Sequence, residues 1–288
     1  MPDSSTSPTR IGRRFEELRR QGDLGLVAYL TAGDPSLDAT RRIVLAAAEA
    51  GADVIELGVP FSDPLADGPV IQRASERALA GGATLAGVLD LIGDIRRESQ
   101  VPLVVFSYFN PILQMGLEQF SERAQAAGAD GVLVTDLPPE DAGEYTRAAH
   151  AHHLDTIFLA APTTGDDRMR TIAASSTGFL YVISRTGVTG QRDELAGDLP
   201  ALLRRARAAT TLPLAVGFGI SLPGHVSVLG GLADAAVVGS ALVAEVERAG
   251  SAQQAATNVA ARIRLLKQAG LRGMSRREAA VPAHGEHS

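Results

Sequence analysis

The sequence predicts a single α/β domain folded as a (β/α)₈ barrel, the TIM barrel, and three observations lead to this class. Eight short apolar segments recur along the chain, and each is followed by a turn and a segment typical of a helix. Strands that alternate with helices pair in parallel through crossovers. The length of 288 residues suits eight such units in one barrel. An open doubly wound sheet is the main alternative, but no GxGxxG motif follows the first segment.

The predicted strands cover residues 24–30, 53–59, 103–108, 131–135, 156–160, 179–184, 214–218 and 235–238. Several of them follow a Gly-Ala-Asp or Pro-Leu entry. Segments rich in alanine, leucine and arginine, such as 41–50 and 201–209, separate the strands and predict the outer helices.

Two further helices flank the eight units. Ile11, Phe15 and Leu18 share one face of a short helix before the first strand, which we expect to cover the amino-terminal end of the barrel. The last helix is predicted over residues 252–269. We therefore expect a flexible start at residues 1–9, the barrel domain at 10–269, and a disordered tail at 270–288, where no periodicity is visible.

Composition excludes several classes of function. The formal net charge of -6 argues against nucleic acid as a partner, because phosphate backbones select basic surfaces. The absence of cysteine excludes disulfides and thiolate chemistry. The start of the chain lacks the apolar core of a signal peptide, and no run of about 18 apolar residues occurs. These features predict a cytoplasmic protein without membrane segments.

Glu56 is the candidate catalytic residue on the second strand. Alternate residues of a barrel strand face inward and outward, and the apolar pair Ile55 and Leu57 belongs against the helices. Glu56 then points into the barrel near its carboxyl-terminal mouth, where barrel enzymes build their sites. A carboxylate there is costly unless it is paired or used. The alternative is a structural carboxylate bonded to a neighbouring strand or to water.

The long loop after this strand carries two more carboxylates, Asp63 and Asp67, within residues 60–69. Long loops in compact domains are usually functional or disordered, and this one follows the carboxyl end of a strand. Two carboxylates in different settings can divide acid and base roles. Capping of a turn or helix is the alternative for either aspartate.

Glycine-rich stretches follow the last two strands, GFGIS at 217–221 and GSAL at 239–242. The loops after strands seven and eight of a barrel often hold phosphate through backbone N–H groups and a short helix start. Two ordinary tight turns are the alternative. The loop at 184–191 after strand six has the length and place of a lid over a phosphorylated substrate.

Missing residue types narrow the reaction further. A Schiff-base mechanism needs a lysine inside the barrel, and the single lysine, Lys267, falls on the last helix. His150, His152 and His153 precede strand five, at the opposite end of the barrel, so no metal site is predicted. Proton transfer by carboxylates is the chemistry that is left.

The run ELGVPFSDPLADGP at 56–69 resembles the signature of the tryptophan synthase alpha chain family. Further matching motifs are YLTAGDP (29–35), YFNP (108–111), DLP (136–138), RTGVTG (185–190), GFGIS (217–221) and VGSA (238–241). The resemblance covers residues 10–269.

This resemblance implies a lyase that cleaves indole-3-glycerol phosphate to indole and glyceraldehyde 3-phosphate in tryptophan biosynthesis. Glu56 then matches the acid–base residue that acts at indole C3 and the glycerol hydroxyl. Asp67 matches the carboxylate at the indole N–H. The residues that the family would use for the substrate are Tyr29, Tyr108, Tyr181, Thr189, Gly190, Phe218, Gly219, Gly239 and Ser240.

The resemblance also implies a partner, a beta chain in an alpha-beta-beta-alpha complex. Asp63 matches a position at that interface. Pyridoxal phosphate would belong to the beta chain, with no cofactor in this one. Phe109 departs from the family, where a second tyrosine is common, and 224–234 matches loosely. Two alternatives stay open: another phosphate-binding isomerase or epimerase, and an idle barrel that only activates a beta chain.

Overall fold

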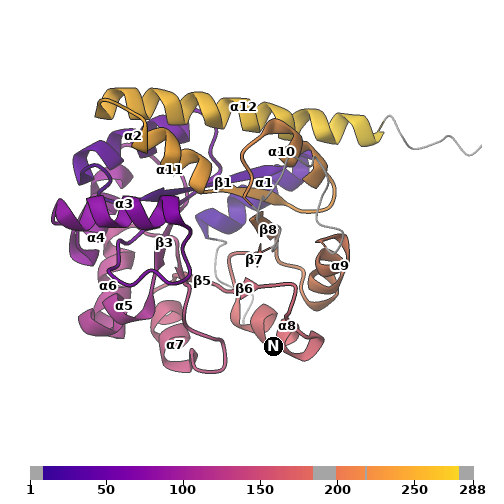
Figure 1. The fold of residues 1–288 in the computed structure, drawn as a ribbon. Helices are drawn as coiled ribbons and strands as arrows, with labels where there is room; N and C mark the ends of the chain where they lie inside the picture. The colour runs from indigo at the N-terminus through magenta and orange to yellow at the C-terminus, as the bar shows by residue number, and fades with distance from the viewer. Residues whose placement is uncertain (1–8, 184–198, 218, 279–288) are drawn as a thin grey trace, which may run out of the picture.

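The strands of the chain form one parallel barrel wall. The structure is a computed structural model that describes residues 9–183, 199–217 and 219–278, with side chains up to 271 (Figure 1). The strands are β1 (Gly25–Thr31), β2 (Val54–Gly58), β3 (Leu103–Ser107), β4 (Gly131–Val134), β5 (Asp155–Ile157), β6 (Leu159–Ala160), β7 (Leu180–Ile183), β8 (Leu214–Gly217) and β9 (Ala235–Val238). Their order in the sheet is β5-β4-β3-β2-β1-β9-β8-β7-β6.

The fifth predicted strand is divided into β5 and β6 at Phe158. β5 pairs with β4 on one side, and β6 pairs with β7 on the other. The two short strands therefore occupy a single position in the wall, and the described strands fill the eight positions of a barrel. The predicted fold class is confirmed.

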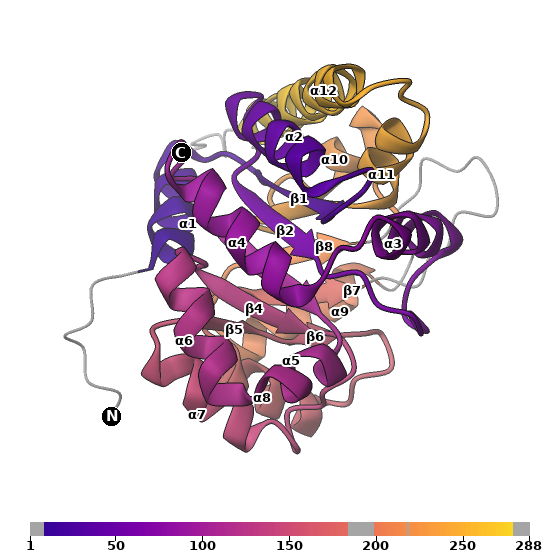
Figure 2. The same ribbon diagram turned by 90° about the vertical axis from the view of Figure 1, so that its left-hand side faces the viewer.

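Helices surround the strands on the outside (Figures 1 and 2). Those in the described residues are α1 (Arg10–Gln21), α2 (Leu37–Glu49), α3 (Pro69–Ala80), α4 (Leu85–Arg96), α5 (Phe109–Met115), α6 (Leu117–Ala127), α7 (Gly143–Ala151), α8 (Asp166–Ser175), α9 (Leu199–Ala209), α10 (Pro223–Leu229), α11 (Ser240–Glu247) and α12 (Ala252–Glu278). No single helix there is long and apolar enough to span a membrane. Helices α3 and α4 together reach the required length and hydropathy, but the angle between them is 94°.

Two separate apolar cores lie on the two faces of the barrel wall. Val54 belongs to the interior core, together with Val27 and Val104 from the adjacent strands. Ile55 and Leu57 belong to the outer core between strands and helices. This alternation follows from the two-residue period of a strand, and it places Glu56 on the inner face with Val54.

Helix α1 closes the amino-terminal end of the barrel, at the opposite end from α3 (Figure 2). Its apolar residues Ile11, Phe15 and Leu18 are buried in the interior core, as predicted. Thr9 caps the helix by accepting a hydrogen bond from the Gly12 N–H at 3.1 Å, which satisfies one of the free donors of its first turn.

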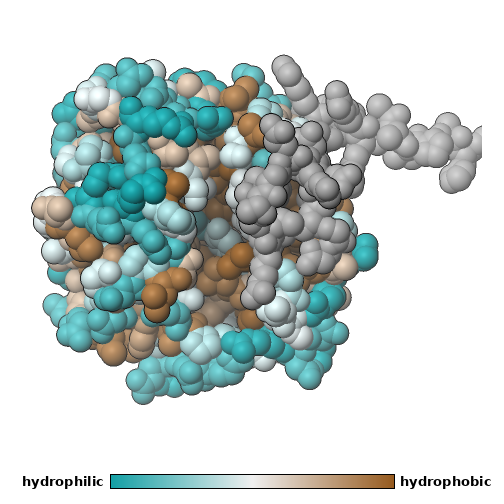
Figure 3. Space-filling view, in the orientation of Figure 1, coloured by the Kyte–Doolittle hydropathy of each residue, from teal (hydrophilic) through white to brown (hydrophobic). Residues whose placement is uncertain are grey.

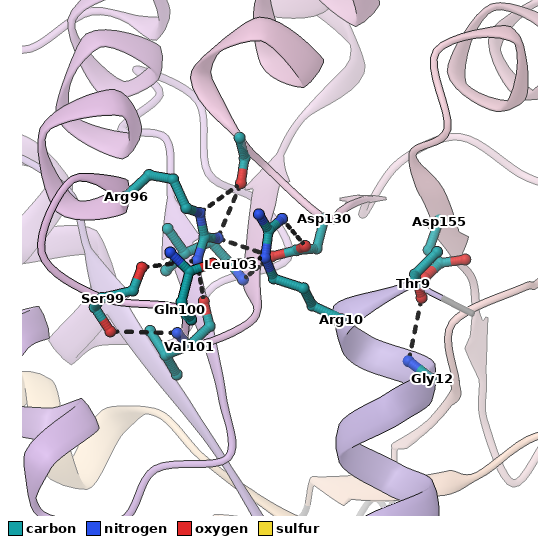
Figure 4. Close-up of polar contacts among 11 residues, drawn as sticks. Thr9, Arg10, Gly12, Arg96, Ser99, Gln100, Val101, Leu103, Asp130 and Asp155 are labelled. Atoms are coloured by element: carbon teal, nitrogen blue, oxygen red, sulfur yellow. Dashed lines mark hydrogen bonds and ion pairs between the residues drawn. The ribbon is translucent and has the colours of Figure 1, made fainter. Parts of the chain in front are cut away.

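Buried aspartates at the strand entries tie α1 to this end of the barrel (Figure 4). The Asp130 carboxylate contacts the guanidinium groups of Arg10 and Arg96, each at 2.9 Å. Thr9 donates to the Asp155 carboxylate at 2.6 Å. A buried carboxylate is tolerated when it is paired in this way, so the Gly-Ala-Asp entries of the sequence anchor the structure.

Lys267 belongs to the same end of the barrel. Its Nζ lies 2.5 Å from the Asp53 carboxylate, which also pairs with Arg14 at 2.6 Å. Because Asp53 directly precedes β2, the only lysine is held at the amino ends of the strands. This agrees with its predicted exclusion from the site.

Helix α12 extends along α2, α10 and α11 and continues beyond them (Figure 1). It ends at Glu278, whereas the sequence predicted an end near residue 269 and an unstructured tail from 270. Gly270 lies inside the helix, where an added Cβ would be in ordinary van der Waals contact with Leu24 and Val226. Residues 279–288 lie outside the described part of the chain.

Candidate active site

Glu56 is completely buried on the inner face of β2. It stands in register between Tyr29 of β1 and Val104 of β3. Its side chain has no exposed surface, and neither carboxylate oxygen has a hydrogen-bond partner among the described residues. The alternative interpretation was a structural carboxylate hydrogen-bonded to a neighbouring strand. No group of the described residues makes such a bond to Glu56.

Burial without a partner raises the pKa of Glu56 from 4.5 to about 8. The cause is desolvation, since the charged form loses its hydration and gains no compensating donor. At neutral pH the side chain is consequently protonated in the free chain. It can donate a proton first and accept one afterwards, as an acid–base residue with a pKa near the working pH should.

A partly open cavity of about 310 Å³ lies at the carboxyl ends of the strands, and its lining includes Tyr29, the residue in register with Glu56. Figure 3 shows the surface hollowed near the middle of the face seen in Figure 1, with hydrophobic side chains around the hollow. The described lining residues are Tyr29, Ile71, Phe106, Tyr181, Gly217, Gly219, Ile220, Ser221, Val237, Gly239, Ser240 and Ala241. One side is aromatic and the other is formed by the two glycine-rich loops.

The aromatic side is built from Tyr29, Phe106 and Tyr181. The rings of Tyr29 and Phe106 meet edge to face, with centroids 5.0 Å apart. Burial raises the pKa of both tyrosines, and the charge of Glu56 raises them further. Both hydroxyls are therefore neutral beside Glu56, and the wall suits a flat aromatic ring.

Two glycines make room for these hydroxyls. A Cβ on Gly58 would lie 2.1 Å from the Tyr29 Oη, and one on Gly217 would lie 2.7 Å from the Tyr181 Oη. Neither position tolerates a side chain without moving a buried ring. The glycines of the ELG and GFG motifs are thus required by the shape of the pocket.

We expect Gly58→Ala to displace Tyr29 and to damage the site. The clash involves a rigid ring in a packed interior, so a loss of about 1–3 kcal/mol in the free energy of unfolding is expected, together with weaker substrate binding. Gly93→Ala is the matched control, because no atom lies within 4 Å of its new Cβ and Ala is favoured inside a helix such as α4. Thermal unfolding of both variants checks this, and equal stabilities would contradict it.

Asp67 is held near the site by Tyr108. The Tyr108 hydroxyl donates to the Asp67 Oδ2 at 3.3 Å and accepts from the Ala66 N–H at 2.9 Å. Tyr108 itself stacks on Phe61, with centroids 5.0 Å apart. The loop at 60–68 is thereby fastened to the end of β3 at both of its ends.

The environment of Asp67 differs from that of Glu56. Partial burial raises the pKa of Asp67 from 3.8 to about 6, and the Tyr108 hydrogen bond opposes this shift. Asp67 is therefore ionised at pH 7 while Glu56 is protonated. Two carboxylates with separated pKa values are the arrangement expected for an acid and a charge-stabilising anion.

The two glycine-rich loops, at 217–221 and 239–241, meet on the other side of the cavity. Gly219 has a φ of 75°, in the left-handed region that favours glycine. Gly239 immediately precedes α11, whose first residue is Ser240. The helix start offers free N–H groups and its positive dipole end, which together bind anions.

The structure brings most of the predicted site residues together. Five of them line the cavity: Tyr29, Tyr181, Gly219, Gly239 and Ser240. Tyr108 contacts Asp67 instead. Thr189, Gly190 and Phe218 lie outside the described residues, as does the predicted lid at 184–191. Asp63 is exposed on the Asp67 loop, where its carboxylate accepts from the Ser62 hydroxyl at 2.6 Å.

Three lining residues lie outside the residues and motifs that the sequence analysis singled out: Phe106, Ile71 and Val237. Phe106 shares the inward face of β3 with Val104, so strand alternation could have found it. Ile71 lies on α3 and looks like any apolar helix residue. The described residues contain no group of three or more histidines or acidic side chains that could hold a metal ion.

Comparisons with known proteins agree with this geometry. A family model described as tryptophan synthase alpha chain matches residues 15–270. The tryptophan synthase alpha chain of Solibacter usitatus is 54% identical over 251 residues, which cover 87% of this chain and 93% of that protein. The alpha chain of Geobacter sulfurreducens is 49% identical, with coverage of 83% and 91%.

The chain belongs to the tryptophan synthase alpha chain family.

Solved structures of the tryptophan synthase family share its fold. The alpha subunit from Legionella pneumophila superposes with a TM-score of 0.85 at 37% identity, covering 92% of this chain and 100% of that one. A tryptophan synthase structure from Mycobacterium tuberculosis gives 0.84 at 33% identity, with coverage of 92% and 99%. The family match at 15–270 contains Glu56, Asp67 and every described lining residue of the cavity.

Proposed function

We propose that this chain is a carbon–carbon lyase that cleaves indole-3-glycerol phosphate to indole and glyceraldehyde 3-phosphate, as the alpha subunit of a tryptophan synthase. The observation that carries the proposal is the environment of Glu56. A buried, unpartnered carboxyl stands in register with Tyr29, which lines a cavity with an aromatic wall on one side and the two glycine-rich loops on the other. Such a cavity matches a substrate with an indole at one end and a phosphate at the other.

The proposed reaction begins with proton transfer from Glu56 to C3 of the indole. The ring becomes an indolenine with positive charge at nitrogen, and the ionised Asp67 stabilises that charge. The Glu56 carboxylate then accepts the proton of the glycerol hydroxyl next to the ring. As the carbonyl of glyceraldehyde 3-phosphate forms, the C–C bond breaks and its electron pair restores the indole.

The ring itself serves as the electron sink in this sequence. The proposed reaction uses no imine, in agreement with Lys267 at the far end of the barrel. The phosphate is held by backbone N–H groups of the loops at 219–220 and 239–241. Holding it fixes the glycerol carbons relative to Glu56, and such positioning is itself a large part of catalysis.

The family name implies a beta chain as partner, and we propose an alpha-beta-beta-alpha complex. The exposed surface of the 60–68 loop supports this, because Leu65 is 94% exposed and Asp63 lies beside it. Within the described part of the chain, both side chains are free of contacts with the barrel core, and they are accessible to a partner on the same loop that carries Asp67. Pyridoxal phosphate would be bound by the beta chain, and the catalytic domain of this chain would be residues 10–269.

Release of indole from indole-3-glycerol phosphate tests the proposed activity directly. We expect the isolated chain to form indole slowly and a beta chain to increase the rate. No indole under either condition would overturn the proposal. Turnover of an indole-free sugar phosphate instead would favour an isomerase or epimerase. Faster beta-chain catalysis without any indole release would favour an idle activator.

A further inference from the structure

Arg262 of α12 connects the two loops that form the phosphate side of the cavity. Its Nε and Nη2 donate to the Glu245 Oε1 at 3.2 and 2.6 Å. Its Nη1 donates to the backbone carbonyl of Ser221 at 3.4 Å. Glu245 belongs to α11, the helix that begins at Ser240, and Ser221 ends the Gly219 loop. One guanidinium therefore contacts Ser221 of one loop directly and the helix that follows the other loop through Glu245.

The two loops need a contact of this kind because the hydrogen bonds between β8 and β9 end before the loops begin. The last registered pair of β8 and β9 is Val216 with Ala236. Residues 219–221 and 239–240 lie beyond that pair, so no strand hydrogen bond fixes their separation. A phosphate bound by N–H groups of both loops requires those groups to converge, and a displacement of about 1 Å is costly in such sites.

Ser221 is fixed at both of its backbone groups. Its N–H donates to the His225 Nδ1 at 3.3 Å, and its carbonyl accepts from Arg262. The Arg262 and Glu245 side chains are mostly buried, with exposed fractions of 28% and 14%. A partly buried ion pair with two donors is less mobile than an exposed ion pair. The Arg262–Glu245 pair can therefore hold α11 at a fixed distance from Ser221.

The Arg262 charge is neutralised by Glu245, and Arg262 is not among the residues that line the cavity. Arg262 therefore acts on a bound phosphate through the loop and helix that it contacts, and this contribution is geometric. We propose that Arg262 is a positioning residue that holds the two phosphate-binding loops at a fixed separation. The proposal rests on the function proposed above, and it assigns to α12 a part in substrate specificity.

Arg262→Met in the full-length chain tests this proposal, because Met keeps the apolar length of the side chain and removes all of its donors. We expect KM for indole-3-glycerol phosphate to rise by about five- to tenfold, the value of one or two lost hydrogen bonds, with kcat changed by less than about twofold. Inhibition by inorganic phosphate should weaken by the same factor, while inhibition by indole should not change. A general loss of structure would weaken both.

Arg248→Met is the matched control. Arg248 contacts the same Glu245 Oε1 at 3.5 Å but is 64% exposed, and it has no contact with Ser221. It should leave both inhibition constants unchanged. Arg262→Lys should give an intermediate result, because an ammonium lacks the fork that reaches both partners. Equal effects of Arg262→Met and Arg248→Met, or a loss confined to kcat, would overturn the proposal.

Two further measurements distinguish a failure of this proposal from a variant that does not fold and from a failure of the proposed function. If Arg262→Met does not fold, Glu245→Gln weakens the same bridge with a smaller change and should show the same selective loss of phosphate inhibition. If the wild-type chain releases no indole, the proposed function fails. Direct binding of inorganic phosphate to the wild-type and variant chains then still decides the role of Arg262, since equal affinities would refute it.

Discussion

Glu56→Gln is expected to lower indole release by about two to four orders of magnitude, the range attributed to general acid–base catalysis. Glutamine fills the same space but can neither give a proton to indole C3 nor take one from the glycerol hydroxyl. Substrate binding should be retained, because the phosphate loops and the aromatic wall are unchanged. The measurement is single-turnover indole formation with the variant in excess.

Asp155→Asn is the matched control for this substitution. Asp155 is also a buried carboxyl whose pKa is raised by burial, but it lies at the amino-terminal end of the barrel, bonded to Thr9. It should retain near-normal turnover. Indole release by Glu56→Gln within about tenfold of the wild type would remove Glu56 from the proposed role.

The fold of Glu56→Gln can be checked by the pH dependence of its stability. The folded state of the wild type binds a proton at Glu56 up to about pH 8, while the unfolded chain loses it near 4.5. Between these values the folded state holds more protons, so the free energy of unfolding falls as pH rises. Glutamine does not titrate, and the variant should lack this part of the slope.

Glu56 shows why part of the site was predictable from sequence. The orientation of β2 follows from its residues, because alternate side chains of a strand point to opposite faces. Ile55 and Leu57 pack against the helices, so Glu56 must point to the inner face. The loops after β8 and β9 were predictable for a similar reason. In a barrel, all strand ends of one kind meet at one mouth.

Other features depend on contacts that a single sequence does not reveal. The split of the fifth strand at Phe158 reflects a change of pairing partner from β4 to β7, while the apolar run itself is continuous. Helix α12 continues through Gly270, at a position that lies next to Leu24 and Val226 in the folded chain. A helix-weakening residue can be overridden by packing in this way.

Charged side chains far apart in sequence were the least predictable part. Nothing in the pattern distinguishes Arg262 from the other arginines of α12, and its two partners come from α11 and the β8–α10 loop. The contacts of Tyr108 with Phe61, Ala66 and Asp67, about forty residues earlier, were not visible in the sequence, and its contact with substrate stays a prediction. Positioning residues of this kind become visible only when the loops are placed in space.

Asp67→Asn is expected to reduce turnover by about two to three orders of magnitude, the usual cost of removing one group that stabilises charge in a transition state. Asparagine can still accept a hydrogen bond from the indole N–H, but it carries no negative charge to offset the charge on nitrogen. The loop should keep its place, because Tyr108 also binds the Ala66 N–H.

The pH profile identifies the role of Asp67 more sharply than the rate alone. The proposed mechanism needs Asp67 ionised and Glu56 protonated, so kcat/KM of the wild type should rise through about pH 6 and fall through about pH 8. Asp67→Asn should lose the acidic limb and keep the alkaline one. Tyr108→Phe removes the hydrogen bond that lowers the pKa of Asp67, so its acidic limb should move to higher pH with only a small loss of rate. The second pKa of the substrate phosphate is also about 6, so the profile of kcat, which reports the bound complex, is the decisive one. If Asp67→Asn retained both the acidic limb of kcat and a near-normal rate, Asp67 would be reduced to a residue of the loop turn.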